Sequence, residues 1–121
     1  MESELLRILD EEMSKITNYE YDEYSGPLVY PYAVGAYSER GFNYEDNSTS
    51  GEIILTLFHR GNRSDLINIK EQVQEVFADY RAVTESGAIS INYRNKLFIR
   101  SGEPELKKME IYLDTKVWKG V

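Results

Sequence analysis

The only histidine in the chain, His59, is the residue best suited by type to acid–base chemistry near neutral pH. It ends an apolar run beside Arg60, just before a Gly61-Asn62 turn signal, where a site has room to form. A general base also needs an orienting partner and a nucleophile, and the sequence contains no Gly-x-Ser-x-Gly elbow. We therefore interpret His59 as structural or solvent-facing and predict no catalytic residue.

Carboxylates are the remaining candidate ligands for a metal ion, because the chain has one histidine and no cysteine. Glu20, Asp22 and Glu23 lie close together but lack the Asp-x-Asp-x-Asp-Gly pattern of a calcium loop. A solvated acidic turn is the simpler interpretation. The sequence also contains no glycine-rich phosphate loop. We predict no metal site and no cofactor.

The net charge of −7 argues against sequence-independent binding to DNA or to an anionic membrane. Arg60, Arg63 and Lys70 make a poor nucleic-acid footprint, and no stretch approaches the roughly 20 apolar residues of a membrane span. The charge is uneven, because residues 1–46 carry 11 acidic and 3 basic side chains whereas residues 47–121 carry 10 and 11. This asymmetry fits a solvated acidic helix and loop, which we favour, or the steering of unlike surfaces together.

Residues 51–60 are expected to form a central strand. Apolar side chains fall on both parities of this run, so both faces of the strand need cover. Ser64 is a suitable N-cap for the helix that follows, and Asp65 suits its first turn. The apolar residues of that helix recur at helical spacing and are Leu66, Ile69, Val73, Val76, Phe77 and Tyr80.

The first half of the chain is expected to begin with an amphipathic helix over residues 3–17. Residues 17–24 read as an edge strand or an ordered loop. Pro31 starts a strand over residues 32–38, in which Gly35 marks a bulge or a close backbone approach. The polar residues 39–50 read as a long loop between two strands.

The second half is expected to be mostly strand. Apolar and polar side chains alternate over residues 88–93, which predicts a strand. This strand either turns through a tight hairpin at Asn95-Lys96 into residues 97–100 or continues as one kinked strand over 88–100, and the sequence leaves both open. The last strand covers 106–118, with Met109, Ile111, Leu113 and Val117 facing the core. The order of these elements predicts one α+β domain, residues 1–121, with a mainly antiparallel sheet of four to five strands and two helices packed on one face.

The middle of the chain resembles the small tail terminator proteins of long-tailed bacteriophages, also called tail completion or tail-to-head joining proteins. The resemblance lies in the order of elements: a first helix, the Pro31-Tyr32 strand, a loop, the strand over Glu52–Phe58, an amphipathic helix and closing strands. It covers roughly residues 3 to 118, and its motifs are made of common residue types.

This resemblance implies a structural virion protein, not an enzyme. It implies a ring, usually hexameric, that caps the tail tube, stops its growth and joins the tail to the neck. The partners would be other copies of the chain, the tail tube protein and a neck or head-completion protein, with DNA passing through unbound. The protein would be made in the host cytoplasm and end in the virion tail or neck, away from any membrane.

Interface residues are expected in the loop 39–50, on the rim at Arg60–Ser64 and among the aromatic residues. Seven of the ten tyrosines lie between Tyr19 and Tyr44, and tyrosine serves both interfaces and intrasubunit packing. The candidate contacts with a neighbouring subunit or the tube are Tyr37, Arg40, Phe42, Tyr44, Arg60, Asn62, Arg63, Tyr112 and Trp118.

Two other interpretations remain open from the sequence. The chain fits another neck or head-completion subunit that docks on the portal side. From a different class, it fits a small α+β binding domain or an enzyme that works in a cleft near His59. Replacement of His59 by Ala separates the last interpretation from the assembly ones.

Overall fold

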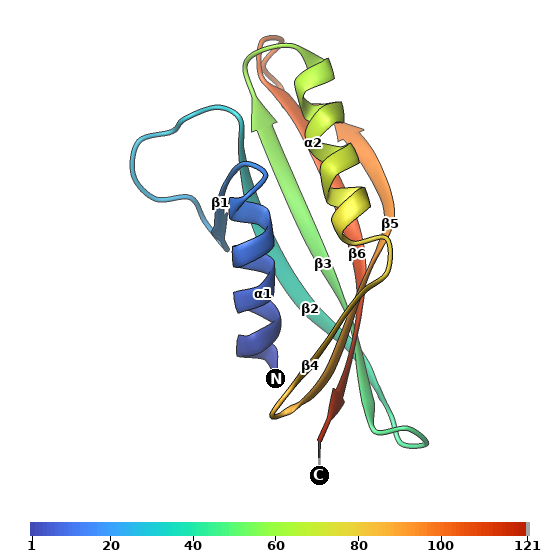
Figure 1. The fold of residues 1–121 in the computed structure, drawn as a ribbon. Coiled ribbons are helices and arrows are strands. Elements are labelled where there is room, and N and C mark those ends of the chain that lie inside the picture. The colour runs from blue at the N-terminus through green and yellow to red at the C-terminus, as the bar shows by residue number, and fades with distance from the viewer. Residues whose placement is uncertain (121) are drawn as a thin grey trace.

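Residues 1–120 form six strands in one strongly twisted sheet, with both of their helices packed on the same face (Figure 1). A computed structural model describes residues 1–120. The elements are α1 (Glu2–Ser14), β1 (Asn18–Tyr21), β2 (Tyr32–Asn43), β3 (Ser48–His59), α2 (Arg63–Val76), β4 (Tyr80–Thr84), β5 (Gly87–Ile99) and β6 (Lys107–Lys119). Across the sheet the order is β1-β2-β3-β6-β5-β4, and β1 alone runs parallel to its neighbour.

The α+β class and the mainly antiparallel pairing are confirmed, but the expected number of four to five strands is too low. The sheet is six-stranded and mixed, because two short edge strands are added. One is β1, whose sequence fits either an edge strand or an ordered loop. The other is β4, whose first residue, Tyr80, fitted the helical spacing. Helix α2 instead ends at Val76, and Phe77 fills the core beyond it.

Strand β3 is interior to the sheet, as predicted, with β2 on one side and β6 on the other. Its residues Ile53, Leu55 and Leu57 are fully buried under the helices. The expectation that both faces are covered is wrong, because Ile54 and Phe58 point to a sheet face that carries no helix and are only partly buried. We call these surfaces the covered face and the open face.

Helix α2 begins two residues earlier than expected, at Arg63, with Asn62 and not Ser64 as its N-cap. Asn62 makes no side-chain capping hydrogen bond. The helix is therefore held mainly by the burial of Leu66, Ile69 and Val73, each worth roughly 1.5–3 kcal/mol when fully buried. Helix α1 ends at Ser14, short of the expected residue 17.

The long loop predicted for residues 39–50 is not present. β2 continues to Asn43 and β3 starts at Ser48, so the connecting turn is only residues 44–47. A bulge between Glu39 and Gly41 bends this hairpin. The other ambiguous segment, residues 88–100, is one long strand, and its kink is a bulge between Tyr93 and Asn95.

The core is a single cluster on the covered face, to which both helices and five of the strands contribute buried side chains. The alternation predicted for the last strand is confirmed, because Met109, Ile111, Leu113 and Val117 are buried. Gly35 is a close approach, since a Cβ there would collide with the hydroxyl of Tyr19. Neither helix of residues 1–120 is long and apolar enough to cross a bilayer.

Candidate functional site

His59 joins strand β3 to helix α2. Its ring is buried, and Nε2 lies 2.8 Å from Oδ2 of Asp65 in the first turn of α2. Gly61 packs directly against the ring, so a larger residue at that position would displace it. Nδ1 is buried without a partner among residues 1–120. The imidazole is thus enclosed between the strand end, the turn and the helix, and it does not line the cleft of about 460 Å³ beside the β5–β6 connection.

The acidic turn predicted around Glu20 is folded by its own hydrogen bonds. The carboxylate of Glu20 accepts hydrogen bonds from the backbone N–H of Ser25 at 2.6 Å and from its hydroxyl at 3.1 Å. Asp22 takes a positive φ of 72°, which the turn requires. Within residues 1–120 no three acidic or histidine side chains gather in a way that could hold a metal ion.

Four predicted interface residues lie at or near the distal end of the β2–β3 hairpin. We call residues 38–47 the hairpin arm; all ten are exposed. The rings of Phe42 and Tyr44 meet edge to face, 4.8 Å apart, and remain 48% and 86% exposed. Arg40 lies along the arm. Tyr37, just before it, is half-buried and lines a second cleft of about 350 Å³ together with Met1, Phe42 and Val117.

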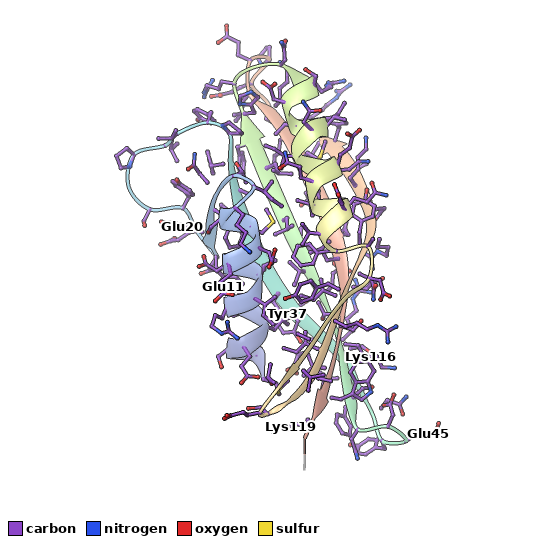
Figure 2. All side chains as sticks on the ribbon, viewed as in Figure 1. Glu11, Glu20, Tyr37, Glu45, Lys116 and Lys119 are labelled. Atoms are coloured by element: carbon purple, nitrogen blue, oxygen red, sulfur yellow. The ribbon has the colours of Figure 1, made fainter. Side chains whose placement is uncertain are left out.

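The turn of the hairpin arm is fixed by several polar contacts. The carboxylate of Asp46 accepts hydrogen bonds from the N–H of Ser48 at 3.0 Å and from its hydroxyl at 2.6 Å, and it pairs with Lys116 at 3.1 Å. The bond from the Ser48 hydroxyl is the main reason why the pKa of Asp46 falls to about 2. Figure 2 shows Glu45 at the tip and Lys116 farther along the sheet.

The other end of the molecule carries Arg60, Asn62 and Arg63. Arg60 donates to Glu103 at 2.9 Å and lies over the ring of Tyr30, at 5.5 Å from its centroid. The guanidinium of Arg63 lies over Phe98, at 4.8 Å. A cleft of about 460 Å³ opens here between the start of α2 and the β5–β6 connection. Its lining includes one carboxylate, that of Glu103, and four basic side chains, those of Arg63, Arg100, Lys107 and Lys108.

The open face carries Tyr112 and Trp118, the last two predicted contacts. The hydroxyl of Tyr112 donates to Glu110 at 2.6 Å, a bond that raises the pKa of the phenol. Cations lie over both rings: Arg94 at 5.4 Å from the Tyr112 centroid and Lys116 at 5.2 Å from that of Trp118. Both aromatic residues are half-buried by these neighbours.

The structure does not bring the predicted contacts into one site. The open-face residues adjoin the arm, because Trp118 pairs with Ser48 in the sheet and Arg94, which lies over Tyr112, shares Glu52 with Arg40. The arm and the Arg60 rim stand at opposite ends of β3, whose 12 residues span roughly 36 Å. Sequence reasoning also missed the charge cluster on the open face. The carboxylate of Glu52, 7% exposed, pairs with Arg40 and, at 2.9 Å, with Arg94, which also binds Asp114. The one sequence feature that could have indicated this cluster is Glu52 itself, a single carboxylate beside the apolar residues of β3.

A search against models of known protein families finds no match for this chain, and a search of curated protein sequences finds none either.

Proposed function

We propose that this chain is a structural assembly protein of the tail-terminator type. In this role copies of the chain form a ring that caps the tail tube of a long-tailed phage, ends tube polymerisation and joins the tail to the neck. Its partners are further copies of itself, the tail tube protein and a neck or head-completion protein, and it acts in the virion without enzymatic chemistry.

The hairpin arm is the observation that carries this proposal. Its ten residues are exposed, and its tip presents the two large rings of Phe42 and Tyr44 to solvent. Burial of such exposed aromatic rings against a partner removes a large apolar area from water, and Tyr and Phe are enriched in protein interfaces. An exposed aromatic pair on a projecting arm is therefore suited to contact another protein.

The arm is also rigid enough to bind without a large entropic cost. The backbone ladder between β2 and β3 runs to the pair Asn43 and Ser48, and Asp46 and Lys116 tie the turn to β6. A preorganised contact surface loses less conformational freedom on binding than a mobile loop. These features support an assembly contact in which the arm reaches a tube subunit or a neighbour in the ring.

The double variant Phe42→Ala/Tyr44→Ala tests the proposal. The rings contribute little to the core, so the variant should keep the wild-type circular dichroism spectrum and melting temperature, while binding to tail tube protein falls by at least about tenfold. Val83→Ala removes an 88% exposed apolar side chain from β4 and is the matched control, expected to bind as wild type.

Pull-down measures the binding of the wild type and of both variants to tube and portal proteins. The terminator role is supported if the wild type and Val83→Ala bind the tube protein and the double variant does not. Wild-type binding to the portal side only would assign the chain to another neck position, and tube binding that survives the double variant would remove the arm from the interface.

A further inference from the structure

The sheet has an unpaired edge on each side. On one side, within residues 1–120, β1 pairs with no strand other than β2. On the other, β4 covers only residues Gly87–Ile91 of β5, and the N–H of Tyr93 bonds to the carbonyl of Phe77. Within residues 1–120, Arg94–Ile99 therefore have no strand on their outer side. Unpaired edges invite pairing with another chain unless they are covered or charged.

The edge at β1 is strongly acidic. Helix α1 packs beside β1, and residues 10–23 carry six carboxylates and one lysine. Figure 2 shows Glu11 of α1 and Glu20 of β1 on this same side of the molecule. Exposed apolar groups accompany the charges, namely Tyr21, Leu28 and Val29. We call this surface the acidic edge.

The edge at β5 is basic. Lys96 lies on its free half, and Arg100 follows it into the cleft of about 460 Å³ that Arg63, Lys107 and Lys108 also line. Glu103 and Glu105 are the carboxylates of the β5–β6 connection, and Glu103 is already paired with Arg60. Leu97 adds a side chain that is 53% exposed. We call this surface the basic edge.

We propose that successive copies of this chain meet head to tail, with the acidic edge of one copy against the basic edge of the next. Two acidic edges repel each other, as do two basic ones, so the charges disfavour a two-fold dimer and favour the unlike contact. A repeated contact between unlike surfaces closes into a ring when the rotation permits. The inference rests on the proposed ring and specifies which surfaces form it.

Charge reversal on each edge provides the test. The acidic-edge variant is Glu11→Lys/Glu23→Lys, and the basic-edge variant is Lys96→Glu/Arg100→Glu. Self-association of each purified variant, followed by sedimentation velocity and native mass spectrometry, should weaken by at least about tenfold relative to wild type. Glu75→Lys/Glu85→Lys changes as many exposed carboxylates away from both edges and should associate as wild type.

Mixing the two edge variants gives the sharper result. Two reversals leave residues 10–23 with four carboxylates and three lysines, so the altered edge loses its excess charge and does not become basic. The acidic-edge variant keeps its basic edge and the basic-edge variant keeps its acidic edge, so the mixture should form a 1:1 dimer through these two unaltered edges and should not close into a ring. The chain that carries all four substitutions should stay monomeric. Formation of the 1:1 dimer also demonstrates that the substituted chains are folded.

Several outcomes would overturn the inference. These are a wild type that stays monomeric at every concentration, edge variants that associate as wild type, and a mixture that fails to assemble. A basic-edge variant that loses binding to duplex DNA but not self-association would assign the cleft to nucleic acid. These results are distinct from failure of the proposed function, because tube binding through the hairpin arm is measured with a different variant.

Discussion

The two faces of the sheet are built from alternate residues of the same strands, yet they are closed in different ways. On the covered face Leu55 of β3 and Ile111 of β6 are fully buried under the helices. On the open face their neighbours Ile54 and Tyr112 are shielded only in part, by side chains of the sheet itself. Fold stability therefore belongs mainly to the covered face, which leaves the open face, edges and arm free for contacts.

The largest expected difference between the faces comes from a matched pair of truncations in β3. Leu55→Ala opens a cavity in the covered face and should lower the free energy of unfolding by about 2–5 kcal/mol. Ile54→Ala, one residue away on the open face, should cost about 1 kcal/mol, because water can fill the space. Urea denaturation of both variants gives the comparison, and equal losses would show that the open face is as tightly packed as the core.

The charge cluster of the open face should have an intermediate effect. Glu52→Gln removes the carboxylate that Arg40 and Arg94 share, but both arginines are more than a third exposed and can be solvated. We expect a loss of about 1–2 kcal/mol, below the cost of breaking a fully buried pair. Glu71→Gln, at an exposed position of α2, is the control and should lie within about 0.5 kcal/mol of wild type.

The smallest effect concerns the turn of the hairpin arm. The pKa of Asp46 is about 2, below its ordinary value of 3.8. Because the folded pKa is lowered, the stabilisation from this carboxylate is complete above pH 3.8 and is lost as the pH falls through about 2. Carboxyl carbon NMR should give that midpoint, and Ser48→Ala should raise it. A midpoint near 3.8 in both proteins would mean that the turn is open in solution.

Elements that bury apolar side chains were predictable from the sequence. The spacing of Leu66, Ile69 and Val73 predicted α2, and the alternation from Met109 to Val117 predicted β6. Both patterns arise because one side of the element faces the core.

Elements held by backbone pairing were not predictable in the same way. Residues 39–43 are polar and exposed, so their hydropathy is that of a loop, yet they extend β2 because β3 pairs with them. The same holds for β4, where the helical spacing of Tyr80 competed with pairing to Ile91. The Glu52 cluster depends on Arg94, which lies 42 residues away in the chain, and no local pattern connects the two.

Electron microscopy of tail tubes assembled with and without this chain tests the central claim most directly. We expect a ring of this protein at one end of each tube and a narrow distribution of tube lengths when it is present. Bare tube ends and unchanged, uncontrolled lengths in the presence of folded protein would contradict it.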